Sequence, residues 1–289
     1  MNDSNPIVKE FIKLNLVKKK NLSHVGFANR GIKVKVFKDI KSNIYLLEKN
    51  KISKNYYLND RKMNFNEVQQ YLKTLYQDDK RRFNQFKHIL NGKKIIDFGC
   101  EYGGFLEIVK RARKKYGVEL NQNCRQYIKK KSKNTQVFER IDEIEEKVDV
   151  ITLFHVLEHL PYQVNFLKHI KNKLIKGGKL IVEIPSANDI LLSLDELVCF
   201  KKFTFWHEHL VLHTIKSLKK ILSQAGYKKI KIIKYQRYNL DNHLGWFLEN
   251  KPGGHIFFKD LTNESTKKNY NNYLVDNSKT DTLIAIATN

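Results

Sequence analysis

Residues 95–104 read IIDFGCEYGG, a short apolar run that ends in a glycine-rich loop. The flanking sequence predicts a strand over KKIIDFG and a helix over FLEIVKRAR, so the loop joins a strand to a helix. Open α/β sheets bind nucleotides at such a junction. A glutamate, Glu101, stands where the dinucleotide-binding pattern G-x-G-x-x-G has its second glycine.

The charge of Glu101 discriminates between nucleotide ligands. A carboxylate at this position would repel the diphosphate of NAD, but it is favourable beside a positively charged ligand. S-adenosylmethionine carries a sulfonium and an ammonium and no phosphate, and its carboxylate could use the helix N-terminus. Glu119 ends the next predicted strand, about twenty residues on, where an acid can accept both ribose hydroxyls. NAD sites use an acid in the same way, so Glu119 does not discriminate between the two cofactors. An NAD-dependent dehydrogenase conflicts only with Glu101.

Strands and helices alternate from residue 93 onward, which predicts βαβ units and a doubly wound, mostly parallel α/β sheet. The predicted strands are KKIIDFG, KYGVEL, TQVFE, DVITLFHVL, KLIVEIPS, KKIKIIKYQ and DTLIAIATN. The predicted helices between them are FLEIVKRAR, CRQYIKKKS, YQVNFLKHIKNKLI, which ends at Gly177-Gly178, and IKSLKKILSQA.

The chain divides into four parts along its length. Residues 1–63 form an N-terminal appendage, in which IKVKVFKDIKSNIYLLE predicts a β-hairpin. Residues 64–236 form the core together with the helix that precedes it. Residues 237–278 are an insertion without a strand or helix prediction, and we expect this long loop to cap the acceptor side. Residues 279–289 supply the final strand of the core sheet.

The glycine loop and the acid beyond it resemble the cofactor signature of class I S-adenosylmethionine-dependent methyltransferases, whose usual loop is D-x-G-C-G-x-G. The matching residues are Asp97, Gly99, Cys100, Gly103 and Glu119. The departure is Glu101, because the glycine usual at that position permits a backbone angle that a side chain resists. DVITLFHVLEHL and GGKLIVEIP resemble the fourth and fifth strands of the same family. The resemblance spans residues 90–235 and implies a Rossmann-like seven-stranded sheet.

The resemblance also implies S-adenosyl-L-methionine as the cofactor and positions for its contacts. Residues 138–142, which end in Asp142, would lie near the adenine. Phe154 and His155 would line the cofactor and acceptor side. Glu101 and Leu120, which adjoin the matching residues, are included among the expected cofactor contacts.

A weaker likeness points to a bacterial subgroup associated with surface-polysaccharide and lipopolysaccharide gene clusters. It implies a small, sugar-linked acceptor such as a nucleotide sugar or glycan precursor. The stretches concerned are FKDIKSNIYLLEKN, Tyr56 and Tyr57, FTFWHEHLVLH, QRYNLDNHLGWFLENKPGGH and DTLIAIA.

Methyl transfer from a sulfonium requires alignment and exclusion of water, and a hydroxyl acceptor also benefits from a base. Trp206-His207-Glu208-His209 follows the fifth predicted strand. In an extended segment, His207 and His209 would share one face and Glu208 the other. The subgroup pattern W-x-x-H-L matches at His209, which is therefore the first candidate base, with His207 second; a purely hydrogen-bonding role for both is the alternative. Trp206 and Glu208 are candidate acceptor contacts.

His155 is a third catalytic candidate, because it follows the fourth strand and would approach the methyl group. Glu158 and His159 are expected only to hold the turn before Pro161. No metal site is expected, since His207 and His209 have no third ligand at a characteristic spacing.

The insertion contributes polar residues that could form a wall for a sugar or phosphorylated acceptor, with Arg237 as a fork for phosphate. A solvated loop closed by a proline-glycine turn is the alternative. The candidate contacts are Arg237, Asn242, His243, Gly253, Gly254 and His255. Trp246 and Phe247 suit either sugar stacking or packing against the sheet.

The chain carries 54 Lys and Arg against 30 Asp and Glu, a net charge of +24 that would attract any polyanion. An RNA or other nucleic-acid methyltransferase is therefore the main alternative, although the lysines are diffuse and the fourth strand lacks an N-P-P-[YF]-like motif for a flipped base. A non-catalytic cofactor-binding protein of the same fold is the second alternative. Salt dependence would separate polyanion binding from binding of a small acceptor.

The expected location is a reducing cytoplasm, because the three cysteines lie far apart and form no C-x-x-C pair. No segment reaches the length needed to span a bilayer, although a lysine-rich face could rest on a membrane surface. The sequence leaves the oligomeric state open.

Overall fold

The computed structural model describes residues 5–28, 32–49, 58 and 63–289. Tyr56 and Tyr57, which contribute to the subgroup likeness, lie outside the described residues. Among the residues that are described, no helix combines the length and the apolar character needed to cross a membrane.

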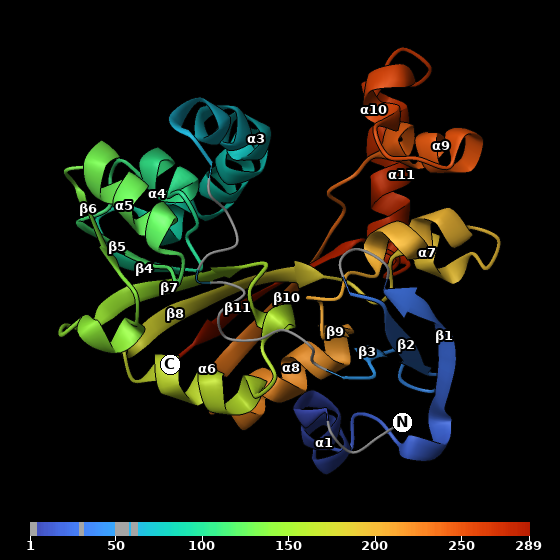
Figure 1. The fold of residues 1–289 in the computed structure, drawn as a ribbon, viewed down its shortest axis with the longest axis horizontal. Coiled ribbons are helices and arrows are strands. Elements are labelled where there is room, and N and C mark those ends of the chain that lie inside the picture. Colours follow the sequence, from blue (N-terminus) through green and yellow to red (C-terminus); the bar gives the residue numbers. More distant parts are fainter. Residues whose placement is uncertain (1–4, 29–31, 50–57, 59–62) are drawn as a thin grey trace.

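A seven-stranded sheet in the order β10-β11-β8-β7-β4-β5-β6 forms the centre of the molecule (Figure 1). In chain order its strands are β4 (Lys94–Phe98), β5 (Lys114–Val118), β6 (Thr135–Phe138), β7 (Val148–Phe154), β8 (Leu174–Pro185), β10 (Lys228–Tyr235) and β11 (Thr282–Thr288). The pairs from β6 to β8 are parallel, and β11 is antiparallel to both of its neighbours. The predicted doubly wound, mostly parallel seven-stranded sheet is therefore confirmed.

The sheet is buried on both faces, because successive strand residues point to opposite sides. Ile95 packs in one apolar cluster with Phe86 and Leu90 of α3 (Phe65–Leu90), whereas Ile96 packs in another with Leu167. Helices cover each face accordingly. On the first lie α3, α4 (Gly104–Ile108) and α5 (Gln122–Lys131), and on the second lie α6 (Gln163–Lys171) and α8 (Ile215–Gln224).

Two predicted helix ends are wrong. The helix after the glycine loop stops at Ile108, because the backbone N–H of Arg113 bonds the carbonyl of Lys93 to begin β5 beside β4. Helix α6 stops at Lys171, and Gly177-Gly178 lies inside β8. A Cβ at Gly178 would lie 3.1 Å from the carbonyl oxygen of Asp149 on β7, so a close approach of two strands explains this glycine.

The N-terminal segment forms a small second sheet in the order β1-β2-β3-β9. Its strands are β1 (Leu22–Ala28), β2 (Val34–Asp39), β3 (Tyr45–Leu47) and β9 (Val211–Leu212). β2 and β3 form a hairpin whose turn is held by Asp39, since its carboxylate accepts hydrogen bonds from the N–H groups of Lys41 and Ser42. The fourth strand, β9, comes from the segment that follows Trp206–His209. The N-terminal sheet therefore includes a strand from the core part of the chain.

The insertion is helical, and the predicted long loop is wrong. It contains α9 (Leu240–Glu249), α10 (Gly254–Phe257) and α11 (Glu264–Asp276), which stand beside α7 (Val198–Thr204) away from the sheet (Figure 1). Asn239 and Asn263 cap α9 and α11 with their side chains. Few apolar residues of these helices are buried, chiefly Trp246 and Leu274. The apolar residues therefore recur only weakly at helical spacing, which is the pattern by which a helix is recognised in a sequence.

Candidate active site

A cavity of about 820 Å³ lies at the carboxyl ends of the central strands, within the usual size of ligand pockets. Its walls come from the middle of α3, the loop after β4, the ends of β5 and β7, the segment from Pro185 to Leu212, and the start of the insertion. The site therefore brings together segments that extend from Tyr71 to Thr282 in the sequence.

The loop after β4 turns through left-handed backbone at Gly99, Glu101 and Gly103, with φ of 75°, 45° and 79°. Glycine is required at position 99 for a second reason, because a Cβ there would lie 2.7 Å from a methyl carbon of Val156. Glu101 adopts the same backbone region with a side chain, at a cost of about 1 kcal/mol. The departure from the family pattern therefore leaves the turn in place.

Two hydrogen bonds hold Glu101 in this conformation. Its backbone N–H donates to Oε2 of Glu119 at 3.0 Å, and its carboxylate accepts from the hydroxyl of Tyr71 on α3 at 2.7 Å. Glu119 accepts a second backbone bond, from Asn121, through Oε1 at 2.8 Å. The two glutamates that the sequence singles out are thus part of one hydrogen-bonded unit.

Buried carboxyl groups line this end of the cavity. Burial raises the pKa of Asp97 to about 7, although its Oδ1 accepts a 2.6 Å hydrogen bond from Thr152. Burial likewise raises the pKa of Asp79 to about 6, against the opposing effect of Arg82, and raises the pKa of Glu119. A positively charged ligand would stabilise the ionised form of all three, whereas a diphosphate would be repelled.

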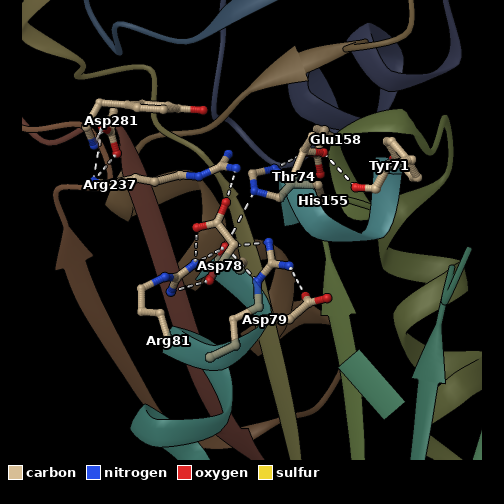
Figure 2. A network of polar contacts seen from close by, with 12 residues as sticks. Tyr71, Thr74, Asp78, Asp79, Arg81, His155, Glu158, Arg237 and Asp281 are labelled. Carbon is tan, nitrogen blue, oxygen red and sulfur yellow. Dashed lines mark hydrogen bonds and ion pairs between the residues drawn. The ribbon is translucent and has the colours of Figure 1, made fainter. Parts of the chain in front are cut away.

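A network of ion pairs ties α3 to the end of the sheet (Figure 2). At its centre is Glu183 of β8, whose side chain is fully buried. Oε1 of Glu183 accepts bonds of 2.8 Å from both Arg81 and Arg82, and Nε2 of His155 lies 3.5 Å from the same oxygen. Burial would raise the pKa of Glu183, but His155, Arg82 and Arg81 hold it well below its usual range.

His155 lies between two carboxylates and, like Glu101, takes a left-handed backbone conformation, with φ of 55°. Its Nδ1 is 3.2 Å from Oε1 of Glu158, opposite the contact with Glu183. Burial lowers the pKa of His155, and the two carboxylates outweigh this effect, so the net shift is upward.

Arg237 closes the network from the insertion side. Its guanidinium bonds Asp78 on α3, and its backbone N–H donates to Asp281 at 3.0 Å (Figure 2). The guanidinium also lies 5.0 Å from the centre of the Tyr238 ring. The start of the insertion is therefore fastened to α3 across the cavity.

Most of the residues that the sequence predicts for the site line the cavity together. They are Asp97, Gly99, Cys100, Glu101, Glu119, Leu120, Phe154, His155, Trp206, Glu208, His209, Arg237, Asn242, His243, Gly253 and His255. Glu208 is buried, and the ring of His209 packs edge-on against Trp206 at 5.5 Å.

Other predicted residues do not line the cavity: Gly103, Asp142, His207 and Gly254. Asp142 accepts a 2.9 Å ion-pair contact from His169 at the surface, and His207 is buried behind the wall. Gly254 packs on Gly245, and a Cβ there would overlap the carbonyl oxygen of Asp241. Gly103 shapes the loop through its backbone alone.

Sequence reasoning missed the contribution of α3. Its residues Tyr71, Asp79 and Arg82 line the cavity, although the run DDKRR reads as a solvated helix face. The mixed charges within one helical turn are the only signal, and exposed helices carry the same pattern. Glu183, in the middle of GGKLIVEIP, is a stronger signal, because a lone acid in a buried strand needs partners.

A family of methyltransferase domains matches residues 68–232 of this sequence. The chain belongs to this family. Methyl transfer is therefore its activity, and S-adenosylmethionine is its cofactor. Comparison of the sequence with curated proteins gives no significant match.

Solved methyltransferase structures are similar to this chain at low sequence identity. An S-adenosylmethionine-dependent methyltransferase from Archaeoglobus fulgidus is 17% identical, with a TM-score of 0.51 over 74% of this chain and 94% of that chain. One from Mesorhizobium loti is 12% identical, with a TM-score of 0.46 over 70% and 93%. Phosphoethanolamine N-methyltransferase 2 of Haemonchus contortus, crystallised with S-adenosyl-L-methionine, is 14% identical, with a TM-score of 0.47 over 73% and 52%.

The residues of the methyltransferase cavity fit this cofactor. The bare backbone at Gly99 and the buried acids Asp97 and Glu119 suit a nucleoside with two positive groups and no phosphate. When bound, S-adenosylmethionine supplies an electrophilic methyl group. The protein supplies the charge, the alignment and the exclusion of water around it.

We expect Glu101→Gln to weaken S-adenosylmethionine binding by about five- to tenfold and S-adenosylhomocysteine binding less, because only the former carries a sulfonium. Glu101→Gly should weaken binding in the same way. Its free energy of unfolding should stay within about 1 kcal/mol of wild type, since relief of backbone strain offsets the hydrogen bond lost to Tyr71. Calorimetric titration measures the affinities, and urea unfolding measures the stability. Equal losses of affinity for the two ligands would exclude an effect of Glu101 on the sulfonium charge.

The affinity for S-adenosylmethionine should rise with pH around 7, because a cationic ligand prefers the ionised form of Asp97, whose pKa in the free protein is about 7. Affinity should therefore fall as pH drops from 8 to 6, and binding at pH 7 should release protons. Titrations in two buffers of different ionisation enthalpy measure this release. Asp97→Asn should reduce the proton release, whereas the exposed Asp276→Asn should not change it. Unchanged proton release in Asp97→Asn would assign the release to another carboxyl group, such as Asp79.

Glu183→Gln should lower the free energy of unfolding by roughly 3–5 kcal/mol, because it leaves two arginines and a histidine without their shared buried carboxylate. Urea denaturation followed by circular dichroism gives this value. The matched control is Glu249→Gln, which removes a half-exposed carboxylate paired to Lys251 and should change the value by less than about 0.5 kcal/mol. A small loss for Glu183→Gln would mean that the helix is held by apolar packing alone.

Proposed function

We propose that this methyltransferase methylates a hydroxyl group of a small sugar-linked acceptor, such as a nucleotide sugar or a glycan precursor, in a reducing cytoplasm. The observation that carries this proposal is that one cavity joins the residues proposed for the cofactor to an acceptor wall that contains aromatic and polar side chains. They include Phe200, Phe203, Trp206, Asn242 and His243. The likeness of the sequence to a polysaccharide-associated subgroup supports the same acceptor class. The free thiols of Cys100, Cys124 and Cys199 suit the reducing compartment.

The cofactor would lie along the loop after β4. Glu119 lines the cavity and would accept the ribose hydroxyls, and the charges of Asp97, Glu101 and Asp79 would stabilise the ammonium and sulfonium groups. Because Phe154 and His155 line the cavity beyond them, the methyl group would point toward the acceptor wall.

The acceptor wall favours hydroxyl groups over extended polyanions. Burial lowers the pKa of His243 to about 4, so this histidine is neutral at physiological pH and bonds the hydroxyl of Tyr270 at 2.8 Å. Asn242 contacts His255 at 3.4 Å, and Trp206 offers a partly exposed ring for stacking on a sugar. Arg237 is the residue we propose for a phosphate on the acceptor.

Of the candidate bases, His209 is the one we propose to act on the acceptor hydroxyl. It lines the cavity, and His207 does not. His155 also lines it, but its two ring nitrogens face Glu158 and Glu183, so it is poorly placed to take a proton from a substrate.

An RNA acceptor is the second candidate, because a lysine-rich groove accompanies the high net charge. The groove is lined by Lys110, Arg113, Lys114, Lys115, Lys131 and Lys133. It lies at the amino ends of β5 and β6, on the opposite edge of the sheet from the cavity. A strand bound there would not bring a base or ribose to the methyl donor, so we favour the small acceptor.

The test is methyl transfer from labelled S-adenosylmethionine to panels of nucleotide sugars, sugar phosphates and RNA, read by mass spectrometry. We expect methylated sugar products and an affinity for the acceptor that changes little with salt; RNA as acceptor would show a steep decline. Glu119→Ala, which should lose cofactor binding, controls for contaminating activity. Transfer to RNA alone would overturn the proposal.

A further inference from the structure

Three side chains converge at the acceptor wall: Glu158 and His159, which are adjacent in the sequence, and His209, about fifty residues further on. Each offers one ligand atom, a carboxylate oxygen or a ring nitrogen, and these atoms all lie within 4.8 Å of one another. The sequence predicts no metal site because it shows no third ligand near His207 and His209. The fold instead brings Glu158 and His159 next to His209. We propose that this cluster, the Glu158–His159–His209 site, binds a divalent transition-metal ion.

Glu158 carries the strongest reason for a cation at this place. The residue is fully buried, and only its Oε1 is engaged, by His155 at 3.2 Å. Its Oε2 is buried without a hydrogen-bond partner among the described residues. A buried carboxylate oxygen without a partner is costly, and a metal ion would satisfy it.

The backbone holds the site in place before any ion binds. Glu158 and His159 lie in the 3₁₀ turn η3 (Leu157–His159), and the carbonyl of Glu158 accepts a 2.9 Å bond from the N–H of Leu210. The rings of His159 and His209 therefore meet edge-on, with their centres 5.0 Å apart. Oε2 of Glu208 lies 3.8 Å from Nδ1 of His159 and places a second carboxylate beside the three ligand atoms.

The ligand types select the class of ion. Two imidazoles with one or two carboxylates suit Zn²⁺, Mn²⁺, Co²⁺ or Fe²⁺, whereas Mg²⁺ and Ca²⁺ prefer sites made of oxygen atoms. Sites with three protein ligands keep coordination positions open for a substrate or water. His159, Glu208 and His209 line the cavity, so the open positions would face the acceptor.

The consequence for catalysis rests on the proposed function, because it concerns the same hydroxyl acceptor. An ion held here would bind the acceptor oxygen, orient it and lower the pKa of its hydroxyl group. His209 would then act as a ligand in the metal-loaded enzyme and would serve as a base only without the ion.

The test begins with binding of the metal alone. The purified full chain is stripped with a chelator and titrated with Co²⁺, which reports its ligands through visible absorption, and with Mn²⁺ followed by electron paramagnetic resonance. We expect one ion per chain, and binding weakened roughly 100-fold in His159→Gln and in His209→Gln. The matched control is His88→Gln, an exposed histidine of α3, which should bind like wild type. Unchanged binding of S-adenosylhomocysteine shows that the variants are folded.

Each outcome bears on a separate claim. No stoichiometric binding, or binding that both histidine variants retain, overturns the metal site. If the ion binds but the stripped enzyme methylates its acceptor at the full rate, the site stands and its part in the reaction is wrong. Failure of every sugar acceptor would overturn the proposed function and leave the metal titration unaffected.

Discussion

The buried carboxylate of Glu183 is the contact on which the active site depends. It lies near the end of β8. Two arginines of α3 direct their positive charge to it, and Nε2 of His155, in the loop after β7, lies 3.5 Å from it. No single one of these groups could be buried alone without a large desolvation cost. Because they share one partner, helix α3 is fixed against the carboxyl edge of the sheet, and its Tyr71 and Asp79 reach the glycine loop.

The two signs of charge are separated in this methyltransferase. The excess of lysine lies on the outside, including the groove at the amino edge of the sheet, whereas the cofactor end of the cavity is lined by carboxyl groups such as Asp97 and Glu119. A net charge therefore says little about the ligand of the site. The local field around the loop, which opposes the net charge of the chain, is the feature that suits a cationic methyl donor.

The sequence predicts the sheet and the cofactor loop well, because both are encoded by local patterns: apolar strands, helix periods and a glycine turn with an acid at the next strand end. It cannot predict contacts that only the tertiary fold creates. The charged run of α3 reads as a solvated face, and the insertion helices bury too few apolar residues to show a clear period. Glu158 and His209 become neighbours only because Leu210 bonds the turn after β7, a link with no signal in either segment.

The place of β9 in the small N-terminal sheet has a consequence for the order in which the protein matures. Leu46 of β3, synthesised early, pairs with Val211, which leaves the ribosome only after most of the central sheet. Contacts between such distant parts of a chain form late and slowly. The N-terminal hairpin must therefore wait, partly exposed, until the segment carrying His209 arrives. The cavity itself is complete only after the last segment has been made, because Asp281 and Thr282 also line it.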